Sequence, residues 1–149
     1  LCGNGGSAAD AQHIAAELGG RFERDRDPLP AIALHENSSF LTAVSNDYSY
    51  EEVYARAVKG LGKSGDLLIG ISTSGKSRNV LNALEAGREK HLTTVGLTGR
   101  GTREMQSACD QLIIVPSDQT ARIQEAHITI GHIICGLVEA ELFPDRKNG

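Results

Sequence analysis

The fold of this chain is decided by residues 66–84, which read DLLIGISTSGKSRNVLNAL. The first six residues are a short, branched apolar run of the kind that forms a buried strand. From Ser77 onward, apolar residues recur at helical spacing behind a potential capping residue. The hydroxyl-rich turn between them, residues 72–77, therefore lies where free backbone N–H groups and the positive end of a helix meet. This arrangement predicts a phosphate cradle, and a Ser-rich capped turn without a ligand is the alternative.

A second turn of the same kind lies at residues 3–7, which read GNGGS. Its glycines allow the backbone to approach a ligand closely, and Ser7 is placed to cap the helix that follows. Two strand–turn–helix units with hydroxyl-bearing turns favour a sugar-phosphate site between the turns. Neither turn has the spacing of a Walker motif and the chain has no GxGxxG run, so nucleoside triphosphate chemistry is not expected.

The remaining sequence alternates between strand-like and helix-like segments. We expect strands at 2–4, 31–34, 67–73, 94–98 and 112–115, and helices at 8–19, 38–45, 50–61, 77–90, 103–108 and 121–142. This order predicts an α/β fold with a Rossmann-like, doubly wound parallel sheet flanked by helices, and ligands at the carboxyl ends of the strands. Because the chain begins inside a predicted strand, we expect one domain over residues 1–149 that lacks an N-terminal helical segment.

Composition narrows the class of protein. The chain has 149 residues and a net charge of −4, and Arg21, Arg24 and Arg26 alternate with acidic residues, which argues against a nucleic-acid surface. No apolar run is long enough to span a membrane, so no membrane partner is expected. The three cysteines are scattered without CxxC spacing, which favours reduced thiols and a cytoplasmic location.

Histidines and polar residues on two predicted helices suggest a metal or acid–base site. His13 and Glu17 are four residues apart and share a helix face, and Gln124 and His132 interrupt the apolar C-terminal helix. Together these four residues are a possible Zn²⁺ ligand set. A solvated His–Glu pair and a core histidine are the alternatives. Gln124 and His132 are also about 12 Å apart along a helix, which is far for one ion.

Four motifs in order resemble the phosphoheptose isomerases of the sugar isomerase (SIS) domain family. They are GNGGSAADAQHIAAEL at 3–18, AVSNDYSYEEVYAR at 43–56, GDLLIGISTSGKSRNV at 65–80 and TARIQEAHITIGHII at 120–134. The resemblance implies a Rossmann-like sheet and a homotetramer with sites between subunits. It also implies conversion of sedoheptulose 7-phosphate to the heptose 7-phosphate aldose, in the ADP-heptose synthesis that supplies bacterial lipopolysaccharide.

The resemblance also implies roles for particular residues. Glu17 and His132 match the acid–base pair, and the zinc ligands of some members match His13, Glu17, Gln124 and His132. The expected substrate-binding residues are Asn4, Gly5, Ser7, Asp47, Ser72, Thr73, Ser74, Ser77 and Gln124. Ligands from different chains of an oligomer would relieve the distance problem at Gln124. One departure is Ala121, where some members carry an acidic residue, and the remaining histidines, His35, His91 and His127, are expected to be structural or exposed.

Two other functions remain open. A SIS-domain protein associated with the bacterial replication initiator resembles this chain, but it lacks acid–base residues at the positions of Glu17 and His132. A SIS domain that senses a sugar phosphate is the third hypothesis. The acid–base pair favours an enzyme, in which a base moves a proton between C1 and C2 through an enediol while an acid serves the oxygens. We expect Glu17 to be the base and His132 the acid.

Overall fold

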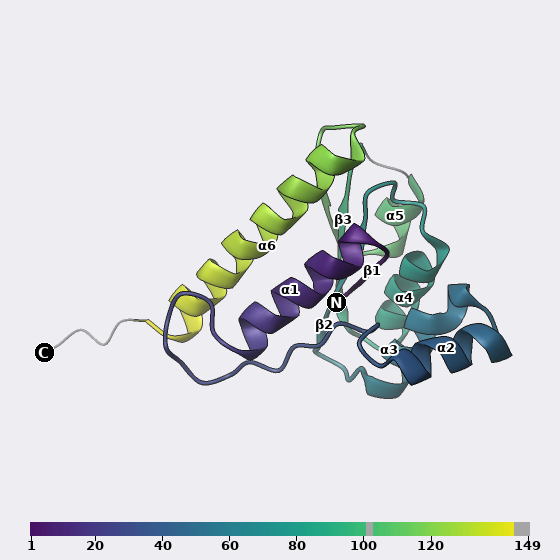
Figure 1. Ribbon diagram of the computed structural model, residues 1–149, viewed down its shortest axis with the longest axis horizontal. Helices are drawn as coiled ribbons and strands as arrows, with labels where there is room; N and C mark the ends of the chain where they lie inside the picture. The colour runs from purple at the N-terminus through teal and green to yellow at the C-terminus, as the bar shows by residue number, and fades with distance from the viewer. Residues whose placement is uncertain (101–102, 145–149) are drawn as a thin grey trace, which may run out of the picture.

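A parallel four-stranded sheet forms the centre of the protein, whose computed structural model describes residues 1–100 and 103–144 (Figure 1). The strands are β1 (Cys2–Gly3), β2 (Leu67–Ser72), β3 (Thr93–Thr98) and β4 (Gln111–Ile114), and they lie in that order across the sheet. The register pairs Gly70 of β2 with Cys2 on one side and with Gly96 on the other. The predicted parallel α/β architecture is confirmed.

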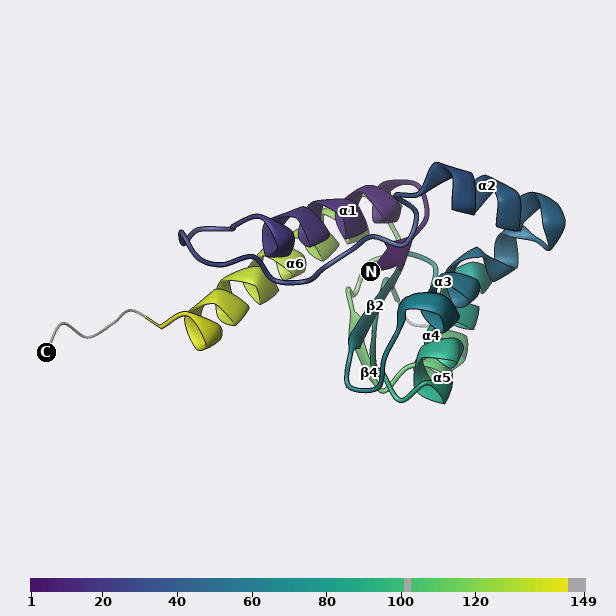
Figure 2. The ribbon, with the colours of Figure 1, turned by 90° about the horizontal axis from the view of Figure 1, so that it is seen from below.

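Helices cover both faces of the sheet. Figure 2 shows α1 (Gly6–Gly19) and α6 (Thr120–Leu142) side by side on one face, and α3 (Val53–Leu61), α4 (Arg78–Glu89) and α5 (Arg103–Ala108) on the other. The helix α2 (Ser38–Asp47) and the short 3₁₀ turn η1 (Tyr50–Glu52) precede α3. The helix predicted at 38–45 thus continues two residues further than expected, through Asp47, and shortens the loop before residue 50. Within the described residues, no helix is both long and apolar enough to cross a membrane.

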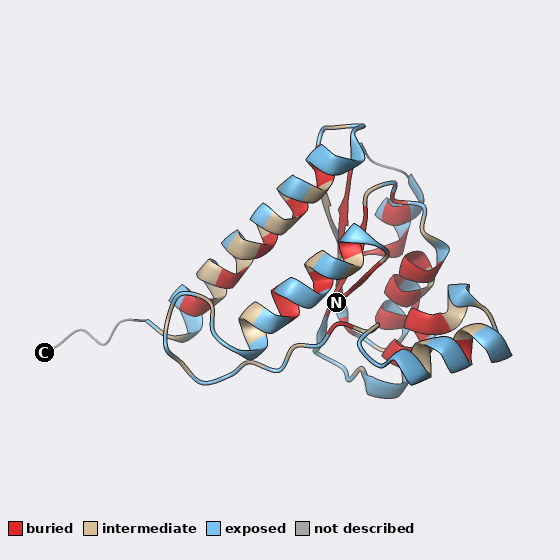
Figure 3. Ribbon diagram, in the orientation of Figure 1, coloured by how far each residue is buried: buried red, intermediate tan, exposed pale blue. Residues whose placement is uncertain are grey.

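Each face of the sheet has its own hydrophobic core, because successive strand residues point to opposite sides. Leu68 of β2 packs with Val80, Leu84 and Met105 beneath α4 and α5. Ile69 and Ile71 belong to the core beneath α1 and α6. Figure 3 shows the buried residues concentrated along the sheet and on the inner sides of the helices that cover it. The two cores hold the sheet rigid between the helices and so fix where its carboxyl edge lies.

The predicted strand at 31–34 is not a regular strand in the structure. The segment makes two backbone hydrogen bonds to Leu1, from the Leu1 nitrogen to the Ile32 oxygen (2.8 Å) and from the Leu34 nitrogen to the Leu1 oxygen (2.9 Å). Pro28 and Pro30 lack N–H donors, so the preceding residues cannot extend this pairing. The segment still runs beside the start of β1, whose other side pairs with β2. The chain thus reverses its direction of winding between β1 and β2, which is where doubly wound sheets bind ligands.

Candidate functional site

The hydroxyl-rich turn follows β2 at this reversal point. The Ser72 hydroxyl lies 2.9 Å from the Ser77 hydroxyl and 3.5 Å from that of Ser74, so three of the four predicted phosphate-binding hydroxyls converge. Gly75 has a φ of 65°, a conformation that favours glycine and closes the turn. Ser77 stands at the N-cap position of α4 but makes no capping hydrogen bond, so that expectation was wrong. Its hydroxyl instead contacts Ser72 inside the turn.

The glycine-rich turn precedes α1 and differs from the prediction in its capping. The helix begins at Gly6, so Ser7 is a buried residue of the first turn and not the cap. Gly5 occupies the cap position with a φ of 57° and has no side chain to cap the helix. The first helical N–H groups are bonded within the turn, since the Ser7 nitrogen donates to the Asn4 oxygen (3.0 Å) and the Ala8 nitrogen to the Gly5 oxygen (3.1 Å). The positive end of the helix dipole still lies at this turn and favours an anion beside it.

Asn4 joins the two turns. Its Nδ2 donates to Asn79 Oδ1 (2.8 Å), and Asn79 Nδ2 donates back to Asn4 Oδ1 (2.9 Å). The Tyr50 hydroxyl also donates to Asn4 Oδ1 (2.9 Å), and the Tyr54 hydroxyl donates to the Gly3 oxygen (2.6 Å). Because Asn79 lies in the first turn of α4, this amide pair holds the glycine-rich turn against the hydroxyl-rich one. Sequence reasoning missed Asn79 and both tyrosines, although an amide just after the turn was a usable signal.

The residues predicted to be the acid–base pair meet where α1 and α6 run alongside each other (Figure 1). His13 Nε2 lies 3.0 Å from Glu17 Oε1 and 3.4 Å from His132 Nε2. The close approach has a local cause at Gly131, where a Cβ atom would lie only 2.5 Å from Ile14 Cδ1. Glycine at this position lets the two helices pack closely enough for their histidines to touch.

The ligand atoms of His13, Glu17 and His132 all lie within 4.8 Å of one another. Two imidazole nitrogens and a carboxylate oxygen are a donor set that suits Zn²⁺ and related divalent metals. His13 is about half exposed and Glu17 a quarter exposed, so the group is reachable from solvent. The structure thus brings three of the four predicted metal ligands together and defines a possible metal-binding group.

Thr73 lies in the hydroxyl-rich turn, and two further predicted site residues, Gln124 and Asp47, lie outside the groups described so far. The Gln124 carboxamide packs against Gly6, where a Cβ atom would overlap it, at the start of α1 and two helical turns from His132. Gln124 is therefore placed beside the glycine-rich turn. Asp47 is exposed at the end of α2, and its carboxylate accepts a hydrogen bond from Asn46 Nδ2 (2.9 Å). His127 is fully buried, as expected of a structural histidine.

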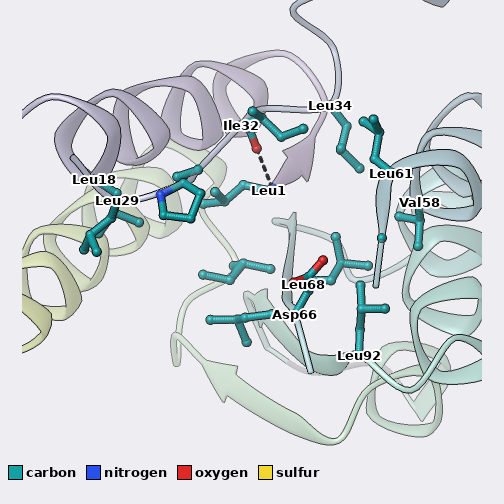
Figure 4. Close-up of a pocket in the computed structure, with 15 residues that line it drawn as sticks. Leu1, Leu18, Leu29, Ile32, Leu34, Val58, Leu61, Asp66, Leu68 and Leu92 are labelled. Carbon is teal, nitrogen blue, oxygen red and sulfur yellow. Dashed lines mark hydrogen bonds between the residues drawn. The ribbon is translucent and has the colours of Figure 1, made fainter. Parts of the chain in front are cut away.

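An apolar cavity of about 510 Å³ lies apart from these residues (Figure 4). Its walls include Leu18, Leu34, Val58 and Leu92, with Asp66 as the one acidic side chain among them. No predicted site residue lines it. It has the chemistry of a hydrophobic surface and not of a sugar-phosphate site, so the candidate site is the polar region around the two turns and the His–Glu–His group.

Comparison with known proteins agrees with this architecture. Residues 1–99 match the SIS domain, so the chain belongs to the SIS domain family. The chain is 55% identical over 148 residues to the phosphoheptose isomerase of Sulfurimonas denitrificans, covering 99% of this chain and 76% of that protein. It is 59% identical over 139 residues to the phosphoheptose isomerase of a Nitratiruptor species, covering 93% and 74% of the two chains. These relationships place it within the phosphoheptose isomerase family.

A solved structure supports the same assignment. The phosphoheptose isomerase of Neisseria gonorrhoeae superimposes with a TM-score of 0.87 at 45% sequence identity. The match covers 93% of this chain and 74% of that one. The four motifs that carry the resemblance are thus part of a fold shared over almost the whole chain.

Proposed function

We propose that this chain is a sugar-phosphate isomerase that converts sedoheptulose 7-phosphate to D-glycero-D-manno-heptose 7-phosphate in ADP-heptose biosynthesis. The observation that carries the proposal is the contact of His13, Glu17 and His132 in a chain related to phosphoheptose isomerases. A protein that only bound the sugar phosphate would have no use for a base and an acid placed together. This contact therefore favours the enzyme over the replication-associated binder and the sugar-phosphate sensor.

The phosphate of the substrate is proposed to bind at the two joined turns. The hydroxyls of Ser72, Ser74 and Ser77 converge there, and Thr73 lies between them in the chain. Asn4 supplies an amide donor from the glycine-rich turn, Gly5 and Ser7 place the positive end of the α1 dipole there, and Gln124 borders the turn. We also propose that Asp47 is a polar residue of the substrate site, on the resemblance alone. Anchoring the phosphate orients C1 and C2 and lowers the entropic cost of the reaction.

The chemical step needs one base and one acid. Glu17 takes a proton from C1 of the ketose and returns it to C2, which makes and consumes an enediol. His132 donates a proton to the carbonyl oxygen at C2 and accepts one from the hydroxyl at C1. Each group ends the cycle in its starting protonation state, so the interconversion is balanced without another reactant.

We further propose that Zn²⁺ binds at His13, Glu17 and His132, with Gln124 of a neighbouring copy as a fourth ligand. The donor set supports this, since two imidazoles and a carboxylate lie within reach of one ion. When bound, the metal supplies Lewis-acid polarisation of the substrate oxygens. A ligand role lowers the basicity of Glu17, so the metal and the proton transfer compete for this carboxylate.

A homotetramer is proposed as the active assembly. Ile133 and Leu137 lie one helical turn apart on α6 and are 56% and 65% exposed, which is costly for side chains of this size in water. A second copy packed along this helix would cover both. If it does, Leu137→Glu should yield smaller species in sedimentation than the unmodified protein.

We place the enzyme in the cytoplasm, because its three cysteines are unpaired and buried, as is usual in a reducing compartment.

The decisive experiment is deuterium incorporation from solvent into sedoheptulose 7-phosphate. The unmodified protein should exchange the C1 proton, and Glu17→Gln should slow turnover by about 10²–10⁴, the range of a lost general base. Glu85→Gln is the matched control, because Glu85 is exposed on α4, on the opposite face of the sheet. No exchange by the unmodified protein would point to the replication-associated binder instead. Equal exchange by the unmodified protein and Glu17→Gln would make His132 the first candidate for the base.

A further inference from the structure

A buried carboxylate joins the loop at residues 20–27 to the last turns of α6, where Arg24 Nη1 also donates to the Phe143 oxygen (2.8 Å). Glu139 Oε1 accepts hydrogen bonds from the Phe22 nitrogen (2.9 Å) and from Arg26 Nε (2.9 Å). Its Oε2 accepts from the Glu23 and Arg24 nitrogens, each at 3.0 Å. The side chains of Glu139 and Arg26 are each 1% exposed. Three consecutive N–H groups and a guanidinium thus surround one carboxylate, so the loop has a fixed position on α6.

Arg26 also binds the end of α1, and so it connects the two helices of the candidate site. Its Nη2 donates to the Glu17 backbone oxygen (2.9 Å) and its Nη1 to the Leu18 oxygen (2.8 Å). The last carbonyls of a helix have no partners within it, and a cation there also suits the helix dipole. Arg26 therefore satisfies the end of α1 at the residue that carries the proposed base, while its Nε holds α6 through Glu139.

The same loop places an aromatic ring on the proposed acid. The Phe22 ring stacks on the His132 ring with 5.5 Å between centroids and 26° between planes. Phe22 Cε1 also lies over Gly136, 3.7 Å from where a Cβ would stand, one turn after His132. The His13 ring meets His132 edge-on with 5.1 Å between centroids. His132 is therefore held between Phe22 and His13, with its Nε2 toward the other site residues.

We propose that Glu139 and Arg26 are positioning residues that act through Phe22 to set the orientation of His132 for proton transfer. The proposal rests on the proposed function, because it assigns His132 the role of acid. Burial of an ion pair is expensive, and an apolar pair of similar size often stabilises a fold as well or better. We explain the charged network here by the groups that it positions. It fixes the end of α1, which carries Glu17, and through Phe22 it fixes the His132 ring.

The first test is Phe22→Leu, with Phe40→Leu as the matched control. Phe40 is also half-buried but packs in the core on the other face of the sheet. We expect Phe22→Leu to lower kcat by about 10–100-fold, as is typical when a group that orients a site residue is lost. KM should stay within about threefold, because the phosphate-binding turns are unchanged. Phe22→Tyr keeps the ring and should keep kcat, and Phe40→Leu should keep kcat whatever it does to stability.

The second readout does not depend on activity. The ring protons of His132 are shielded by the stacked Phe22 ring, and their NMR signals are identified by their loss in His132→Gln. Phe22→Leu should move these signals toward the positions of an unstacked histidine. Glu139→Gln should move them in the same direction and lower kcat, because an amide cannot accept all four hydrogen bonds. If Glu139→Gln does not fold, Arg26→Lys tests the same link. Lysine keeps the charge but lacks the guanidinium whose separate nitrogens contact α1 and Glu139 at once.

The proposal is overturned if Phe22→Leu leaves both the His132 signals and kcat as in the unmodified protein. It is also overturned if Glu139→Gln, or Arg26→Lys in its place, changes only the stability. If the unmodified protein has no isomerase activity, the proposed function fails on that ground alone. The His132 signals would then still decide whether the loop orients this ring.

Discussion

Gly131→Ala is expected to damage the site by forcing α1 and α6 apart. The added methyl would lie 2.5 Å from Ile14 Cδ1 and 2.6 Å from Ile14 Cγ1, and Ile14 is only 2% exposed. To relieve this contact, the buried Ile14 side chain must change its conformation or α1 must shift, and such overpacking costs about 1–3 kcal/mol. Alanine also favours the helix over glycine by about 1 kcal/mol, so the net loss of stability is smaller than the strain itself.

A matched substitution separates these two effects. Gly60→Ala lies in α3, where nothing is within 4 Å of the added methyl, so it gains the helix preference without the clash. The difference in unfolding free energy between the two variants should therefore be about 1–3 kcal/mol, measured in urea at one protein concentration. Because His132 follows Gly131, kcat should also fall by about tenfold or more in Gly131→Ala and stay unchanged in Gly60→Ala. Equal stability of the two variants would refute the idea that this glycine sets the helix spacing.

Three further predictions concern the phosphate, the metal and pH. Ser74→Ala should weaken sugar-phosphate binding by about 1–3 kcal/mol in calorimetry with the fold unchanged, and unaltered affinity would remove this hydroxyl from the cradle. His13→Ala should lose Zn²⁺ in metal analysis of the purified protein, whereas full activity of the unmodified protein in strong chelator would exclude a catalytic role for the metal. Burial acts to raise the pKa of Glu139, but the N–H donors of Phe22, Glu23, Arg24 and Arg26 outweigh it and lower the pKa to about 2. Its folded pKa lies below the ordinary value of 4.5, so its stabilisation is complete above pH 4.5 and is lost as the pH falls toward 2. Between pH 4.5 and 2, the unfolding free energy of Glu139→Gln should therefore depend less on pH than that of the unmodified protein. The same pH dependence in both would contradict the lowered pKa of Glu139.

Much of the fold was predictable because its signals are local. An apolar run, a turn rich in hydroxyls and a helical period occur within residues 66–84, and each depends on neighbours in the chain. The strand predicted at 31–34 was wrong because strand formation also depends on a distant pairing partner, which a local sequence pattern does not reveal. A strand requires a partner along its length, and this segment pairs only with Leu1. The two expected caps failed similarly, since the Ser77 hydroxyl bonds Ser72 and α1 starts one residue before Ser7.

The sequence by itself determined the order of the elements, the chemistry of the two turns and the pairing of His13 with Glu17, because four residues of helix suffice to bring these two together. Only the tertiary structure decided which distant groups meet. His13 and His132 are 119 positions apart, and their contact depends on how closely α1 and α6 pack at Gly131. The same packing leaves Gln124 beside Gly6 and brings Glu139 to the loop that carries Phe22. Such contacts follow from the three-dimensional packing of whole elements, and no spacing along the chain specifies them.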